Sequence, residues 1–210
     1  MAGRFAFGIL PFALNNAPMS APARILVLFA HPAYHRSRVQ RALADAVRGL
    51  DGVTFHDLYE EYWDFQLDVA HEQDLLRAHD LIVFQHPFYW YSSPAILKEW
   101  QDLVLEHGFA YGEEGTALRG KRLLSVLSAG GPAEAYGREG YNHFTVGELL
   151  TPFEQTARLC GMEYLPPFVV HNARALSDRE IDGHAGAYRR RLAELRGGAE
   201  VAAETTEAAR

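Results

Sequence analysis

The chain has 210 residues, of which 48% are hydrophobic and 22% are charged, a composition typical of globular proteins with a substantial core. Its formal net charge of -7 argues against a general nucleic-acid-binding protein, which normally presents a basic face. The single cysteine, Cys160, excludes an internal disulfide and does not suffice for a cysteine-based zinc site.

The two ends of the chain differ from its middle. Residues 1–22 carry an apolar patch broken by Pro11, and we interpret them as a flexible extension, with a secretory signal as the alternative. Residues 198–210 are small and polar, which predicts a flexible tail. One domain is therefore expected over residues 23–197. No stretch reaches the roughly 20 apolar residues needed to span a bilayer. The lone cysteine permits a reducing compartment, and we expect a cytoplasmic protein.

Apolar segments and helical patterns alternate along this domain. Five apolar segments have the length of buried parallel strands: Arg24–Ala30, Val53–Leu58, Leu81–Pro87, Arg122–Gly131 and Met162–Val170. Helical spacing follows in the segments that begin near Ser37, Glu72, Pro94, Leu149 and Asp178, and Gly161 and Gly197 are expected at helix ends. The alternation predicts an α/β fold, a doubly wound sandwich over a five-stranded parallel sheet.

Ligands of such sheets bind beyond the carboxyl ends of the strands, so the loops after the first, third and fourth strands deserve inspection. After the first strand, Ser37 is placed to cap a helix, and His31, His35, Arg36 and Arg38 surround that helix end. Hydroxyl, backbone amides and helix dipole together favour a phosphate group there. A plain capped helix with solvated arginines is the alternative.

The other two loops are aromatic and glycine-rich. Phe88, Tyr89, Trp90 and Tyr91 follow the third strand and suit a flat heteroaromatic ring, although a lid on the core or a dimer contact would also use them. Gly130 and Gly131 follow the fourth strand and allow close approach of a ligand to the backbone. The long loop that follows the glycine pair is expected to be functional, and an ordinary solvated loop is the alternative. A phosphate seat, an aromatic wall and a glycine shelf at one sheet edge together predict a flavin mononucleotide (FMN) pocket.

Specific stretches in this chain resemble a known family, the flavodoxin-like NAD(P)H:quinone oxidoreductases, and within it the ancillary flavoproteins of glutathione-regulated potassium-efflux systems. The resemblance runs from about Arg24 to Leu195 and is carried by AHPAYHRSR, HPFYWYSSPAILKEW, HGFAYGEEGTALRGK, SAGG and CGMEYLPPFVVH. It implies a flavodoxin-like sheet of order 2-1-3-4-5 and a homodimer. It also implies a bound flavin, FMN or alternatively FAD, and NAD(P)H as the reductant.

The resemblance also assigns roles to residues. Phosphate-side contacts fall on His31, Ser37, Arg38, Val39 and Gln40, and ring contacts on Phe88, Tyr89, Trp90, Tyr91, Ser128, Ala129, Gly130 and Gly131. A Tyr and a His of the wider family that assist hydride transfer correspond to Tyr136 and to Asn142, next to His143. No metal site is expected, because the ten His residues are scattered along the chain.

The implied activity is that of an NAD(P)H dehydrogenase (quinone), which passes two electrons to a quinone by a ping-pong cycle through the flavin. Three alternatives stay open at this point. The chain would instead be a regulatory subunit of a potassium-efflux transporter, peripheral to the inner membrane, or an azo- or nitroreductase, or an electron carrier of the flavodoxin type.

Overall fold

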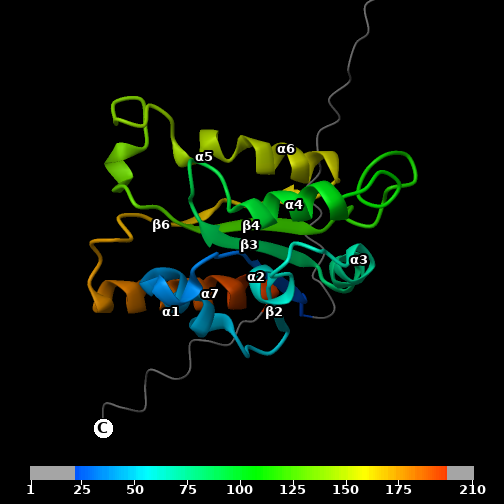
Figure 1. Cartoon of the computed structure of the whole chain (residues 1–210), viewed down its shortest axis with the longest axis horizontal. Coiled ribbons are helices and arrows are strands. Elements are labelled where there is room, and N and C mark those ends of the chain that lie inside the picture. Colours follow the sequence, from blue (N-terminus) through cyan, green and yellow to red (C-terminus); the bar gives the residue numbers. More distant parts are fainter. Residues whose placement is uncertain (1–21, 198–210) are drawn as a thin grey trace, which may run out of the picture.

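The computed structural model describes residues 22–197, which form a parallel β-sheet between two layers of helices (Figure 1). The strand order is β2-β1-β3-β4-β5, with β6 paired to β4, and this confirms the predicted order of the first five strands. The bounds are β1 (Ile25–Phe29), β2 (Val53–Asp57), β3 (Leu81–Pro87), β4 (Arg122–Ser128), β5 (Glu163–Tyr164) and β6 (Phe168–Val170). The expectations for both termini lie outside the described residues.

The last predicted strand is the one correction to the sheet. Residues 162–170 were expected to form one strand, but they form two short strands, β5 and β6, which pair with different parts of β4. Pro166 and Pro167 stand between them, and proline has no N–H to donate to a neighbouring strand. The sheet therefore has six strands instead of five.

The helices fall into two groups, one for each face of the sheet. Figure 1 shows α4 (Ala95–Val104) and α6 (Thr151–Leu159) above the sheet and α1 (Arg38–Val47) and α7 (Asp178–Arg196) below it. Helix α3 (Val69–Ala78) and the single-turn helices α2 (Leu58–Glu61) and α5 (Val146–Leu149) contribute to the same core as α4 and α6. Two 3-10 turns, η1 (Tyr34–Arg36) and η2 (Ala133–Ala135), lie in the loops after β1 and β4.

Both faces of the central strands are buried, which explains why these strands read as continuous apolar runs. In β1, Leu26 and Leu28 pack into the core between the sheet and helices α4 and α6. Ile25 and Val27 point to the other face and pack into the core between the sheet and helices α1 and α7. All four side chains are 0% exposed.

Helix ends agree with most of the sequence signals. Ser37 caps α1 as expected, and Gly197 ends α7 in the left-handed conformation, with φ of 93°. Gly161 lies one residue beyond the C-cap of α6 with φ of 71°. Pro94 occupies the N-cap position of α4, which agrees with the predicted start of this helix near Pro94. Helix α3 begins three residues earlier than the predicted Glu72, because Asp68 caps it.

A buried carboxylate holds α3 and α4 against the sheet. Glu72 is 0% exposed and accepts hydrogen bonds from His56 Nε2 at 2.7 Å, Tyr62 Oη at 2.6 Å and Trp100 Nε1 at 2.7 Å. Burial by itself raises the pKa of Glu72, but the bonds from His56 and the other two donors outweigh it, so the pKa is lowered. The carboxylate is thus held ionised at the junction of β2, α3 and α4.

None of the helices between residues 22 and 197 is long and apolar enough to cross a membrane.

Candidate functional site

The parallel strands deliver their following loops to one edge of the sheet, as the sequence predicts. Pro87 at the end of β3 is in register with Ser128 at the end of β4, and Ser128 is in register with Val170 at the end of β6. Two adjacent cavities open at this edge, a first cavity of about 470 Å³ and a second of about 730 Å³. Both volumes lie in the range of small-molecule sites. Four residues line both cavities, which makes them neighbours: Phe88, Tyr89, Gly130 and Arg174.

The first cavity opens onto the amino end of α1. Ser37 Oγ accepts a hydrogen bond from the Gln40 N–H at 3.1 Å, so the Ser37 hydroxyl proton is free to be donated to a ligand. Arg38 and Val39 form the first turn of the helix, where backbone amides have no partner within the helix, and both residues line the cavity. With the helix dipole, this arrangement favours an anion.

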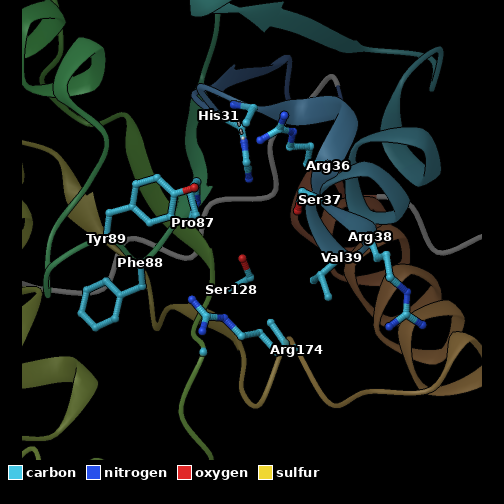
Figure 2. Close-up of a pocket in the computed structure, with 13 residues that line it drawn as sticks. His31, Arg36, Ser37, Arg38, Val39, Pro87, Phe88, Tyr89, Ser128 and Arg174 are labelled. Atoms are coloured by element: carbon cyan, nitrogen blue, oxygen red, sulfur yellow. Dashed lines mark hydrogen bonds between the residues drawn. The ribbon is translucent and has the colours of Figure 1, made fainter.

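His31 adds a second donor from the loop after β1. The Ala33 N–H donates to His31 Nδ1 at 3.0 Å, so the neutral ring carries its proton on Nε2. Burial, with a smaller contribution from His35, lowers the pKa of His31. Figure 2 shows His31 and Ser37, from the loop after β1, and Ser128, from the end of β4, around the same cavity. His31 is therefore a neutral donor toward an anion.

The arginines of this region have different roles. The Arg38 guanidinium turns away from the first cavity to Asp178 at 2.5 Å and to the Leu176 carbonyl at 3.0 Å (Figure 2). Arg38 therefore offers the first cavity its backbone amide, with its positive charge directed to α7. Arg36 and Arg174 line the cavity and supply positive charge there.

Arg174 is the site residue that sequence reasoning missed. It follows β6, the last strand, and lines both cavities. The rule that ligands meet the loops after the strands would have found it, had the loop after the last strand been included.

Gln40 lies beneath the first cavity and does not line it. The side chain is 0% exposed, and its Nε2 donates to the His86 carbonyl at 2.8 Å and to Ser128 Oγ at 3.1 Å. Any contribution of this side chain to ligand binding therefore passes through Ser128, which lines the cavity.

An aromatic segment forms one wall of the second cavity. All four predicted residues line it: Phe88, Tyr89, Trp90 and Tyr91. Trp90 and Tyr91 have φ values of 48° and 63°, in a region that costs a non-glycine residue roughly 1–3 kcal/mol. Such strain persists where the surrounding structure or a function requires it. Trp90 is also 92% exposed, so its ring is available for contact with a ligand or a partner.

The glycine pair after β4 also lines the second cavity. A Cβ atom on Gly131 would lie 2.8 Å from Tyr141 Oη and 3.3 Å from Tyr136 Cε2, so a larger residue would displace these rings. Ala129 is 0% exposed, and its N–H donates to the Val170 carbonyl at 2.8 Å. Ala129 therefore ties the loop to β6, while Gly130 and Gly131 line the cavity.

Two of the three predicted catalytic residues meet in the second cavity. Tyr136 and Asn142 line it, and Asn142 Oδ1 accepts a hydrogen bond from Tyr91 Oη at 3.0 Å. Burial, with smaller contributions from Tyr141 and Tyr91, raises the pKa of Tyr136, so its hydroxyl stays protonated at neutral pH. His143 is exposed and is not among the lining residues of either cavity.

Within residues 22–197, no group of three or more His, Cys, Asp or Glu side chains is arranged to hold a metal ion.

Comparisons with known proteins agree on the fold and differ in the names they carry. The chain is 48% identical over 170 residues to the glutathione-regulated potassium-efflux system ancillary protein KefG of Serratia proteamaculans, covering 81% of this chain and 93% of that protein. A solved structure of general stress protein 14 from Treponema denticola, in complex with FMN, has a TM-score of 0.79 and 40% identity, over 82% of this chain and 99% of that one.

Two further solved structures are similar. An NADPH-quinone reductase from P. pentosaceus has a TM-score of 0.74 and 36% identity, over 80% of this chain and 97% of that one. A chain described as a thermophilic tryptophan halogenase from Streptomycin violaceusniger has a TM-score of 0.77 and 49% identity, over 79% of this chain and 96% of that one. Because such different names accompany one fold, the activity must be argued from the site itself.

A family model described as a flavodoxin-like fold matches residues 23–192. The parallel sheet, its strand order and the two helical layers agree with that match. The chain belongs to the flavodoxin-like family.

Proposed function

We propose that this chain binds FMN across the two cavities and acts as an NAD(P)H:quinone oxidoreductase. The observation that carries the proposal is the pairing of an anion-binding cavity with an aromatic and glycine-lined cavity at one sheet edge. FMN has the matching two parts, a phosphate and a flat tricyclic ring. The similar structure in complex with FMN and the similar NADPH-quinone reductase support this assignment.

The residues of the first cavity fit the phosphate. His31 Nε2, the Ser37 hydroxyl and the amides at the start of α1 are all donors, and Arg36 adds positive charge. FAD, which shares this phosphate, is the alternative cofactor.

The residues of the second cavity fit the ring. The absence of a side chain at Gly131 keeps open a space that a Cβ atom would narrow against Tyr141. Tyr89 and Tyr91 contribute aromatic rings to the lining of the same cavity. Bound FMN would supply the redox chemistry, accepting a hydride from NAD(P)H and passing two electrons to the acceptor.

Protein groups around the ring would handle charge and protons. Gly130 and Gly131 line the second cavity, and their backbone amides would stabilise negative charge on a reduced ring. Reduction of a quinone to a quinol consumes one hydride and one proton, and the protonated Tyr136 hydroxyl is a hydrogen-bond donor in the same cavity. Asn142, already oriented by Tyr91, leaves its amide N–H groups for the substrate.

Steady-state kinetics test this function. The FMN-loaded protein is mixed with NADH or NADPH and a simple benzoquinone, and oxidation of the nicotinamide is followed at 340 nm. We expect sustained turnover and parallel lines in double-reciprocal plots, the pattern of a ping-pong cycle. FMN-loaded protein that oxidises neither nicotinamide with any quinone would contradict the proposal. Azo and nitro compounds in the same assay distinguish the alternative acceptors.

A second candidate function is that of an ancillary subunit of a potassium-efflux transporter. It is favoured by the 48% identity to KefG over 93% of that protein. Potassium efflux from cells that express a glutathione-regulated transporter, with and without this chain, would test it. Higher efflux with the chain supports the subunit role, and equal efflux contradicts it.

A further inference from the structure

A line of four buried polar side chains runs from α7 under the sheet edge to the first cavity. Tyr188 Oη donates to Gln85 Oε1 at 3.1 Å, and Gln85 Nε2 donates to Gln40 Oε1 at 3.2 Å. Gln40 Nε2 then donates to Ser128 Oγ at 3.1 Å. Tyr188, Gln85 and Gln40 are 0% exposed, so water does not reach the bonds among them, and Ser128, at 8% exposure, lines the cavity.

One backbone carbonyl fixes the direction of every bond in this line. Gln40 Nε2 lies 2.8 Å from the His86 carbonyl oxygen, which only accepts hydrogen bonds. The Gln40 amide nitrogen must therefore face His86 and Ser128, and its oxygen must face Gln85. An amide oxygen only accepts, so Gln85 presents its nitrogen to Gln40 and its own oxygen to Tyr188.

The far end of the line is a fixed donor. Because an amide oxygen only accepts, the Tyr188 hydroxyl must donate to Gln85 Oε1. Burial raises the pKa of Tyr188, so the hydroxyl keeps the proton that it donates. Bonds that all point the same way polarise one another, which strengthens each.

The near end of the line determines the state of Ser128. Because Ser128 Oγ receives the Gln40 bond, the Ser128 proton is left to be donated, and no other partner of this hydroxyl occurs among the hydrogen bonds of residues 22–197. Ser128 lines the first cavity, and Figure 2 shows its hydroxyl on the cavity side.

We propose that Gln40, Gln85 and Tyr188 form a positioning relay that commits the Ser128 hydroxyl to donating a hydrogen bond to an oxygen atom of FMN in the first cavity. The inference rests on the proposed FMN site. Gln40, Gln85 and Tyr188 are positioning residues, since Ser128 alone would touch the ligand. Ser128 is thereby set as a donor before the ligand arrives, which matches the anion-binding character of His31 and Ser37 in the same cavity.

Titration of the apo protein with FMN, followed by quenching of flavin fluorescence, tests the relay. Ser128→Ala removes the donor and should raise the FMN Kd about tenfold, the effect of one hydrogen bond to a charged or strongly polar oxygen. Gln40→Glu keeps the shape of the side chain, but its carboxyl group carries at most one proton. It therefore cannot donate to both the His86 carbonyl and Ser128 Oγ, and the FMN Kd of this variant should also rise about tenfold. Tyr188→Phe acts two side chains away and should raise the Kd roughly threefold.

The double variant Gln40→Glu/Ser128→Ala separates a relay from a general loss of structure. If Gln40 acts through Ser128, the double variant binds FMN within about twofold of Ser128→Ala alone. Independent effects that multiply in the double variant would overturn the relay. Where Gln40→Glu fails to fold, Gln40→Met replaces it, because it keeps the length of the side chain and removes its polar atoms.

A matched control is available elsewhere in the core. Gln73 is 8% exposed, and its Nε2 donates to the Val104 carbonyl at 3.2 Å and to Glu106 at 2.8 Å, between α3 and α4. Gln73→Met should lower the melting temperature and leave the FMN Kd within twofold of wild type. If the wild-type protein binds FMN and the Ser128, Gln40 and Tyr188 variants bind it equally well, the relay is overturned and the proposed function is not. Wild-type protein that binds no FMN would overturn the proposed function and the relay together.

Discussion

Two histidines at the sheet edge show how burial and a single contact decide what an imidazole does. His31 is held by the Ala33 amide on Nδ1, which leaves Nε2 as a donor toward the first cavity. His86 donates from Nδ1 to the Pro87 carbonyl at 2.9 Å, and its Nε2 has no hydrogen-bond partner in the described part of the chain. Its ring is fully buried against Phe153.

The burial of His86 makes stability depend on pH. Burial lowers the pKa of His86 to about 4 from 6.5, so the unfolded chain takes up the proton first as pH falls. The folded state therefore loses stability progressively from about pH 6.5 down to about pH 4, by on the order of 3 kcal/mol for this one group.

Urea unfolding at pH 7, 6 and 5 measures that loss. His86→Leu should make the free energy of unfolding depend less steeply on pH over this range. An unchanged pH dependence in the variant would mean that His86 binds a proton as readily in the folded state as in the unfolded chain.

In the second cavity, the Tyr136 hydroxyl is the group we expect to assist the reduction of the acceptor. Tyr136→Phe keeps the ring against Phe88 and His171 and removes only the donor. We expect kcat to fall roughly 10- to 100-fold while the flavin content stays at the wild-type level. Tyr111→Phe, in a loop that lines neither cavity, is the matched control and should retain full kcat. A Tyr136→Phe protein with full turnover would remove this hydroxyl from the reaction.

Among the structural elements, α1 combines a structural cap and a binding site at one residue. Aspartate caps helices as well as serine does, so Ser37→Asp should keep α1 folded and the melting temperature unchanged. The added negative charge faces the proposed phosphate position, and the FMN Kd should rise at least about tenfold. Riboflavin, which lacks the phosphate, should be affected much less.

Ser177→Asp at the start of α7 is the control for this charge. Ser177 is also an N-cap, and it lines neither cavity, so this variant should bind FMN as wild type does. Equal losses of FMN and riboflavin affinity in Ser37→Asp would place the phosphate elsewhere.

Helices α3 and α4 depend on a single carboxylate between them. Glu72→Gln removes the negative charge that strengthens the bonds from His56, Tyr62 and Trp100. The indole N–H of Trp100 can only donate, so the new amide must turn its oxygen to Trp100, and His56 and Tyr62 must change from donors to acceptors. We expect a loss of about 2 kcal/mol in the free energy of unfolding. Chemical denaturation measures this loss, and FMN affinity should not change, because none of these residues lines either cavity. A variant as stable as wild type would show that the carboxylate is not needed there.

For the whole molecule, the local sequence determines the central strands and helix caps well. β1 and β3 were predictable because both of their faces are buried, which requires unbroken apolar sequence. Pro166 and Pro167 indicate that the last predicted strand is split, because proline cannot donate to a neighbouring strand. The length of the apolar segment around them favoured a single strand instead. Local sequence could not show that Gln40 is buried, because its partner Ser128 lies 88 residues away in the chain.

Other expectations stay predictions at this scale. The homodimer is one of them, and Trp63 and Trp90, at 80% and 92% exposure, are the side chains that a second copy would be expected to cover. The exposed His143 is another, since either a partner chain or a shift of its loop would be needed to bring it to the second cavity.

The loops at the strand ends are proposed to form one site for a flavin nucleotide, and equilibrium binding of FMN tests whether they do. The protein is purified, any bound yellow cofactor is released and identified, and the apo protein is titrated with FMN. We expect one FMN to bind per chain, with quenched fluorescence and a shifted absorption spectrum. Colourless protein that leaves the fluorescence of both FMN and FAD unchanged at saturating concentration would contradict it.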